Sequence, residues 1–212
     1  MKKLCLILSI GILTLTSGAI AAEPVRLGFV YMFSGRGAIL GGVSRQGAEL
    51  AIEEINKAGG INGRQVVGIF RDSKAKPDVG GEAARKLVTE DKVDAVIGVI
   101  SSGVVPKVSE VLNELRTPLI ITTAVNPIVT GKKCNRYTFR VVGTANMLLK
   151  ATALIAKKTG AKRWTTIGPD YALGHGSWAL FKKYLKEARP DVEFLPESDA
   201  VFAPLAIVQT SH

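Results

Sequence analysis

Apolar stretches alternate with amphipathic stretches along most of the chain. Residues 24–33, with the sequence PVRLGFVYMF, are apolar and rich in strand-forming side chains, and a glycine-containing turn at 34–42 follows them. In residues 43–59 apolar side chains recur at the spacing of one helix face, with charged side chains on the other face. The apolar positions are Ala48, Ala51, Ile52 and Ile55. This order predicts a strand, a turn and an amphipathic helix.

The first predicted helix ends at a glycine-rich segment. Gly59 and Gly60 can take the left-handed backbone conformation that closes the carboxyl end of a helix. Gly63 then turns the chain into the apolar segment 64–73. We therefore expect a second strand directly after the helix.

The same alternation of strand and helix repeats toward the end of the chain. We expect helices at 77–91, 104–116, 145–160 and 174–190, and further strands at 64–73, 93–100, 117–124, 161–170 and 191–198. These strands are near-continuous apolar runs, which are typical of a parallel sheet that helices cover on both faces. The pattern therefore predicts the α/β class.

The first 22 residues have the layout of a secretory signal peptide. Two lysines precede an apolar run from Leu4 to about Leu15, and the small residues SGAIAA follow it. The run is shorter than the about 20 apolar residues that cross a bilayer. We expect cleavage near Ala21 or Ala22 and export of a soluble protein to the periplasm; a buried amino-terminal strand is the alternative.

Charge and cysteine content add little to this interpretation. The net charge of the chain is +10, but the basic residues are spread out, and the densest group, at 180–190, resembles the solvated face of a helix. The lysines of this face are Lys182, Lys183 and Lys186. We therefore favour a solvated face over a nucleic-acid site. Cys134, the one cysteine outside the predicted signal, is expected to be a buried and inert thiol in preference to a reactive one.

The turns that follow the strands are the candidate site, because ligands of open α/β sheets bind beyond the carboxyl ends of the strands. Four such turns stand out, at 33–41, 101–105, 122–127 and 169–176. Three of them offer hydroxyls or glycine N–H groups near helix starts, where backbone N–H groups and the helix dipole attract anions such as a carboxylate. A structural alternative carries equal weight: Ser34, Ser101 and Thr123 can act as helix caps.

Signals for catalysis, metals and cofactors are weak. His175 and His212 are the only histidines and lie far apart in sequence, so a zinc site is not expected. There is no G-x-S-x-G elbow and no Walker loop. A partial dinucleotide signal, Gly35-x-Gly37, lacks the third glycine at the required spacing, and Asp72 fits a ribose-binding acid no better than a turn residue. We expect no enzyme activity, no cofactor and no metal.

Several motifs together resemble one family. The segment from VRLGFVYMFSGRG to INKAGGINGR at residues 55–64, the DS pair after the second strand, and the later motifs AVIGVISSG, TPLIITTAVNP and YTFRVVG occur in the order found in periplasmic branched-chain amino-acid-binding proteins. These are the type I solute-binding proteins of ABC importers, and the resemblance covers residues 23 to about 200. It implies two α/β lobes that close on a small solute and present it to a membrane permease.

The resemblance also implies a lobe division and a set of ligand-binding residues. Residues 23–143 would form the first lobe and 144–212 part of the second. In amino-acid-binding members, the turns after the third and fourth strands hold the ligand carboxylate and ammonium. The residues at the matched positions are Ser101, Ser102, Gly103, Thr122, Thr123 and Ala124. Tyr171, in a turn of the second lobe, would contact the ligand, and Phe33 would line its side-chain pocket.

Two departures from the family pattern change the expectations. Val125 stands where amino-acid binders tend to have a threonine that helps to bind the ammonium and carboxylate, which favours an aromatic or aliphatic acid over an amino acid. The chain also ends at His212, before the family pattern completes the second lobe, so a truncated product with poor solubility and weak ligand binding is expected. Two other classes stay open: an α/β enzyme with a nucleotide or flavin cofactor, and a sensory ligand-binding module.

Overall fold

A five-stranded parallel sheet forms the amino-terminal half of the protein. The structure, a computed structural model, describes residues 23–196 and 201–203. The strands are β1 (Val25–Tyr31), β2 (Val66–Asp72), β3 (Ala95–Gly98), β4 (Leu119–Ile121) and β5 (Thr138–Arg140). Their order across the sheet is β2-β1-β3-β4-β5, and all neighbours are parallel. The α/β class and the parallel sheet predicted from the apolar runs are confirmed.

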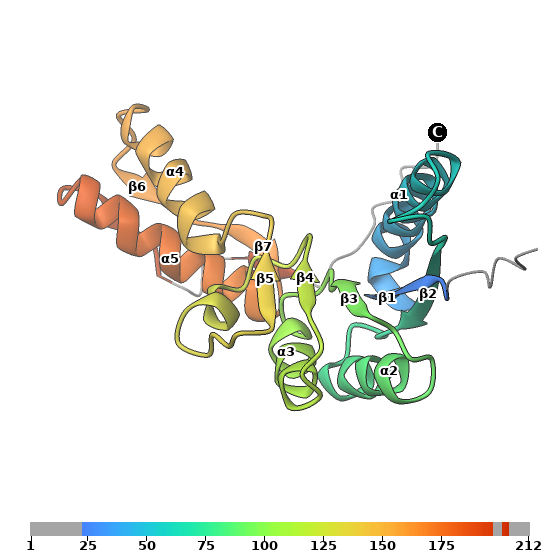
Figure 1. Cartoon of the computed structure of the whole chain (residues 1–212). Coiled ribbons are helices and arrows are strands. Elements are labelled where there is room, and N and C mark those ends of the chain that lie inside the picture. The colour runs from blue at the N-terminus through green and yellow to red at the C-terminus, as the bar shows by residue number, and fades with distance from the viewer. Residues whose placement is uncertain (1–22, 197–200, 204–212) are drawn as a thin grey trace, which may run out of the picture.

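Helices lie on both faces of this sheet. Helix α1 (Ala38–Lys57) packs on one face, and α2 (Pro77–Thr89) and α3 (Val105–Glu114) pack side by side on the other (Figure 1). Successive side chains of β1 lie on opposite faces of the sheet. Val30 is part of the core under α2 and α3, whereas Phe29 and Tyr31 are part of the core under α1. This alternation is the period-two geometry of a strand buried on both sides.

The end of α1 shows the predicted glycine geometry. Gly59 and Gly60 have φ values of +99° and +77°, in the left-handed region. The N–H of Gly60 donates to the carbonyl of Ile55 at 2.9 Å and that of Gly59 to Asn56 at 3.1 Å, the two bonds of a Schellman motif. The helix therefore ends where the sequence predicts, and the chain passes into β2.

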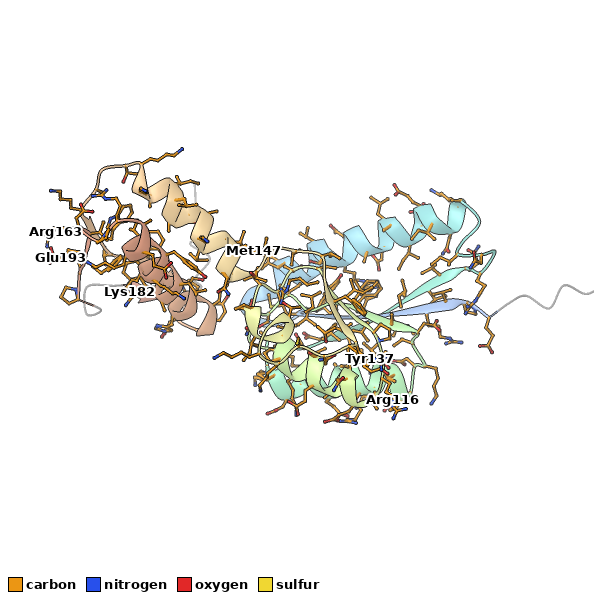
Figure 2. All side chains as sticks on the ribbon, turned by 60° about the vertical axis from the view of Figure 1, so that its left-hand side comes forward. Arg116, Tyr137, Met147, Arg163, Lys182 and Glu193 are labelled. Atoms are coloured by element: carbon orange, nitrogen blue, oxygen red, sulfur yellow. The ribbon has the colours of Figure 1, made fainter. Side chains whose placement is uncertain are left out.

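A second, smaller α/β part follows β5. It contains α4 (Ala145–Lys157) and α5 (Ala172–Ala188), which pack against each other, and two short parallel strand pairs. The pairs are β6 (Arg163–Trp164) with β8 (Glu193–Phe194), and β7 (Ile167–Pro169) with β9 (Val201–Ala203). Trp178, Phe181 and Leu185 of α5 form the centre of a separate apolar core. Figures 1 and 2 show this part beside the five-stranded sheet, with Met147 close to the junction.

Some predicted boundaries differ from the observed ones. Helix α1 begins at Ala38, five residues before the predicted start, so part of the predicted glycine turn is helical. It can begin there because Gly41 lies against the carbonyl of Met32, where a Cβ would come within 1.9 Å of the oxygen. The strand predicted at 161–170 is two short strands. Residues 197 and 198 of the strand predicted at 191–198, and the predicted signal at 1–22, lie outside the described residues.

Large apolar side chains remain exposed on both parts. On α1, Ile39 and Val43 are 62% and 63% exposed, and on α4 Met147 and Ile155 are 65% and 67% exposed. In the five-stranded sheet, Phe139 of β5 is also exposed. Surfaces of this kind favour association in water. Among the described helices, none combines the length and apolar character needed to cross a bilayer.

Candidate functional site

Three turns meet at the carboxyl edge of the five-stranded sheet. Parallel pairing places Val30 of β1 beside Gly98 of β3, and Gly98 beside Ile121 of β4. The segments that leave these strands, 32–37, 99–104 and 122–127, are therefore neighbours in space. This edge is where the sequence placed the ligand site.

The turn after β3 presents unpaired hydrogen-bond donors. The carbonyl of Ser101 accepts the N–H groups of Val104 and Val105 at 3.1 Å each, which starts α3. The side chain of Ser101 forms no cap, so the capping alternative is not supported here. Among the described residues, the N–H groups of Ser102 and Gly103 have no hydrogen-bond acceptor. These donors lie beside the amino-terminal end of a helix, where the helix dipole favours an anion.

The turn after β4 has the same character. The N–H groups of Thr122 and Ala124 donate to β3 and its following turn, at 3.3 Å to Gly98 and 3.1 Å to Val99. Thr123, between them, is exposed, and neither its N–H nor its hydroxyl has a hydrogen-bond partner within the described part of the chain. The Ala124 side chain is buried in the core under α2 and α3, so Ala124 offers only main-chain atoms.

Hydrogen bonds join these two turns to each other. The N–H of Val125 donates to Ser102 Oγ at 3.1 Å, and Asn126 Nδ2 donates to the carbonyl of Ser102 at 2.9 Å. Asn126 Oδ1 also accepts the N–H of Ile128 at 3.0 Å and so caps the short 3₁₀ helix η2 (Pro127–Thr130). The two turns therefore form one hydrogen-bonded unit, and the Asn126 side chain makes two of its bonds.

Arg140, at the end of β5, also forms hydrogen bonds to this unit. Its guanidinium donates to the carbonyl oxygens of Ala124 and Asn126, the latter at 2.6 Å. Burial lowers the pKa of Arg140 from its ordinary value. Sequence reasoning did not select Arg140 or Asn126. The Asn-Pro pair signals a turn, but no local pattern marks Arg140 as a contact of residues 124–126.

Phe33 follows β1 and is fixed by Asp72 at the end of β2. Asp72 Oδ1 accepts the N–H groups of Phe33 at 2.9 Å and Lys74 at 2.8 Å, and its Oδ2 accepts the Ser34 hydroxyl at 2.6 Å. Burial acts to raise the pKa of Asp72, but these bonds and the charge of Lys74 hold it below its ordinary value. Asp72 is thus a turn residue, and Ser34 bonds to it in place of capping a helix. The Phe33 ring packs against Tyr31 and Phe70, in the core beneath α1.

Tyr171 lies in the second part, at the residue that precedes α5. Its N–H donates to the carbonyl of Pro169 at 2.9 Å, and its side chain is 41% exposed. Partial burial raises the pKa of the Tyr171 phenol. Within the described residues, no hydrogen bond or ring contact joins Tyr171 to the turns at the sheet edge.

A cavity of about 290 Å³ separates the joined turns from the second part. Ser102, Asn126 and Pro127 line it from the sheet side. The residues that line it from α4 and α5 are Ala145, Asn146, Leu173, Gly176, Ser177 and Leu180. The size is just below the roughly 300–1,000 Å³ typical of small-molecule sites. Of the predicted ligand-binding residues, Ser102 faces this cavity directly.

Val125 connects the site to the second part. Its carbonyl accepts the N–H of Ala145, the first residue of α4, at 2.8 Å. Val125 also lines a second cavity of about 690 Å³, together with Leu148 and Leu149 of α4. An apolar residue at this position therefore faces apolar neighbours.

The other groups with potential chemistry lie apart from this edge. His175 Nε2 and Asp170 Oδ1 are 2.9 Å apart and exposed. No cluster of metal-ligating side chains occurs in residues 23–196 and 201–203. The expectation that Cys134 is buried is wrong: its thiol is free and exposed, because it lies in the turn after η2 and not in the core.

These features define an α/β protein in which an edge with unpaired N–H donors faces a second α/β part across a cavity. A sequence profile described as "Periplasmic binding protein" matches residues 24–206. The chain belongs to this family. The family, predicted from the motifs of the sequence, is confirmed.

Similar proteins bind amino acids or aromatic acids. Leu/Ile/Val-binding protein homolog 3 of Brucella melitensis is 32% identical over 170 residues, which is 80% of this chain and 46% of that protein. A solute-binding protein of an ABC transporter from R. palustris, solved in complex with benzoate, has a TM-score of 0.76 and 25% identity over 88% of this chain and 50% of its own. The substrate-binding protein LivJ of Streptococcus pneumoniae, solved with isoleucine, has a TM-score of 0.69 and 26% identity over 77% of this chain and 47% of its own.

The chain spans about half the length of these relatives. The matched residues include all five strands β1–β5 and the turns of the candidate site.

Proposed function

We propose that the chain is the substrate-binding component of an ABC importer and that its ligand is a small carboxylate. One observation carries the proposal: the joined turns after β3 and β4 present N–H and hydroxyl donors that have no partner among the described residues. The N–H groups of Ser102 and Gly103 and the donors of Thr123 suit the oxygens of a carboxylate. Donors without catalytic partners are suited to binding, and the proposed role includes no chemical step.

The second part would complete the site by closure. Ser102 and Asn126 face Leu173 and Ser177 of α5 across the cavity between the two parts. A ligand held by both sides favours the closed arrangement, because it gains contacts there that the open arrangement lacks. In this proposal residues 23–143 and 144–212 act as the two lobes, and Tyr171 and Phe33 contribute to the ligand pocket after closure.

The ligand is either a branched-chain amino acid or an aromatic or aliphatic acid without an amino group. The relatives include proteins that bind each kind of ligand: one was solved with isoleucine and another with benzoate. Val125 favours the second kind, since an ammonium near this turn would find an apolar side chain in place of a hydroxyl. An ammonium without partners in a buried site costs several kcal/mol.

Export and delivery complete the proposed role. The predicted signal peptide at residues 1–22 would direct the protein to the periplasm, and a membrane permease would receive the ligand. The sequence profile of a periplasmic binding protein supports this location.

Thermal unfolding of the purified chain against a ligand panel tests the proposal. The panel contains leucine, 4-methylpentanoate, benzoate and benzamide. A ligand at a hundred times its dissociation constant adds about 2.7 kcal/mol to the folded state. We expect stabilisation by the two acids without an amino group and none by benzamide. If no carboxylate raises the melting temperature, the proposal is wrong.

Two variants separate the proposed contacts from general effects. Ser101→Ala combined with Thr123→Ala should weaken carboxylate binding by about 1–3 kcal/mol, the range for hydrogen bonds to a charged group. Val125→Thr should shift the preference from 4-methylpentanoate toward leucine. The matched control is Thr89→Ala, a hydroxyl on α2 away from the edge, which should leave affinity unchanged. Equal affinity of the double variant and the control would remove these turns from the site.

A further inference from the structure

The Arg140 guanidinium forms its shorter hydrogen bonds with main-chain carbonyl oxygens. Besides the carbonyls of Ala124 and Asn126, its Nε donates to Thr130 Oγ1 at a long distance of 3.4 Å. In the described part of the chain no carboxylate forms an ion pair with Arg140, and burial lowers the pKa of its guanidinium. A partly buried guanidinium without an acid partner is unusual, because buried charges are normally paired.

The carbonyl that Arg140 contacts belongs to a chain of hydrogen bonds. The carbonyl of Ala124 and the N–H of Val125 are the two ends of one planar peptide group. The N–H end donates to Ser102 Oγ at 3.1 Å. The Arg140 guanidinium therefore connects to the Ser102 hydroxyl through a single peptide group.

The Ser102 hydroxyl accepts one hydrogen bond and, within the described residues, donates none. Its oxygen accepts the Val125 N–H, and the Asn126 amide bonds to the Ser102 carbonyl and not to the hydroxyl. No residue of the described ranges accepts a hydrogen bond from Ser102 Oγ. Its proton is thus available, and Ser102 lines the cavity between the two parts.

This chain of hydrogen bonds makes the Ser102 hydroxyl a stronger hydrogen-bond donor. A cation at the carbonyl polarises the peptide group, which strengthens the N–H bond to the hydroxyl oxygen, and an oxygen that accepts a strong bond releases its own proton more readily to an acceptor. The same guanidinium shields two carbonyl oxygens whose partial negative charges would repel a carboxylate. Both effects favour an anion over a neutral ligand.

We propose that Arg140 is the positioning residue that gives the site its preference for anions, acting through the 124–125 peptide group on the Ser102 hydroxyl. The preference for an anion rests on the proposed function, whereas the hydrogen-bond chain does not. Arg140 itself touches no ligand in this proposal.

The first experiment needs no ligand. Amide hydrogen exchange at Val125, followed by NMR, is compared in the parent chain and in Arg140→Gln, Arg140→Lys, Ser102→Ala and Arg136→Gln. Arg136 is an exposed neighbour whose guanidinium lies over the Tyr137 ring, so its variant is the matched control. We expect exchange about tenfold faster in Arg140→Gln and Ser102→Ala, the effect of losing about 1.4 kcal/mol of protection. Unchanged exchange in Arg140→Gln would overturn the proposal.

The second experiment measures the anion preference by calorimetry, as the ratio of the dissociation constants of benzamide and benzoate. This ratio should fall about tenfold in Arg140→Gln, the lower end for a hydrogen bond to a charged group. Arg140→Lys keeps the charge and should retain most of the parent chain's ratio. Arg136→Gln should retain all of that ratio. In the Ser102→Ala background, Arg140→Gln should cause little further loss, because both residues act through one chain.

The outcomes distinguish this proposal from the proposed function. If benzoate and benzamide weaken equally in Arg140→Gln, Arg140 is only structural and the proposal is wrong. If the parent chain binds no carboxylate at all, the proposed function fails, and the amide exchange at Val125 then decides whether the hydrogen-bond chain exists. A melting curve for each variant shows whether it is folded before either measurement is interpreted.

Discussion

Asn126 offers the sharpest test of the joined turns. Asn126→Ala removes the bond from Nδ2 to the Ser102 carbonyl and the bond from Oδ1 to the Ile128 N–H. Both partners are part-buried, and an unsatisfied buried group costs about 1–3 kcal/mol. Partial access of water reduces this cost, so we expect a loss of about 2 kcal/mol in the free energy of unfolding. At roughly 3 °C per kcal/mol for a chain of this size, the melting temperature should fall by about 6 °C.

The matched control is Asn113→Ala. Asn113 is exposed on α3 and its side chain forms no hydrogen bond within the described residues. Alanine has the higher helix propensity, so this variant should melt at the same temperature as the parent or slightly above it. Differential scanning fluorimetry and urea unfolding measure both variants. If Asn126→Ala and Asn113→Ala melt within 1 °C of each other, by the roughly 3 °C per kcal/mol above, Asn126 does not hold the turns together.

Four further outcomes follow from the structure. Asp72→Ala should destabilise the chain by about 1–2 kcal/mol at pH 7. Because folding lowers the pKa of Asp72, its stabilising contribution is present at a pH above its unfolded-state pKa and is lost as the pH falls below about 4. The difference in melting temperature between parent and variant should therefore shrink at about pH 3. Gly60→Ala should destabilise more than Gly59→Ala, because a Cβ at Gly60 would lie 2.1 Å from the Arg64 carbonyl oxygen whereas one at Gly59 meets nothing; equal urea midpoints would contradict this. Cys134 should react with a maleimide in the native chain as fast as in urea. The exposed apolar side chains of α1 and α4 should cause concentration-dependent association in sedimentation velocity, and a monomer at all concentrations would contradict it.

The predictable part of the fold comes from local patterns. Apolar runs in residues 24–33 and 93–100 form strands in the interior of the parallel sheet, and the run in residues 64–73 forms its edge strand. The glycines at the end of α1 stop the helix by their left-handed backbone conformation. The start of α1 was less predictable. Gly41 and Gly42 have low helix propensity and favour a turn, but close packing against Met32 overrides that preference.

The candidate site was predictable in position but not in its connections. The turns after β3 and β4 follow from the rule that ligands bind beyond the carboxyl ends of parallel strands. Cys134 was predicted to be buried because cysteines usually are, yet its turn lies at the surface. Which donors of Ser102, Gly103 and Thr123 remain unpaired depends on the turns themselves and not on residue type.

By itself, the sequence determined most of the elements of this protein, their parallel arrangement and the family. These properties depend on periodicity, on glycine positions and on motif order, all of which are written along the chain. Only the tertiary structure decided that Ser102 receives the Val125 N–H from 23 residues away and that Arg140 holds the Asn126 carbonyl from 14 residues away. Such contacts depend on strand register and on the direction of each side chain, and these are settled only when the strands lie side by side.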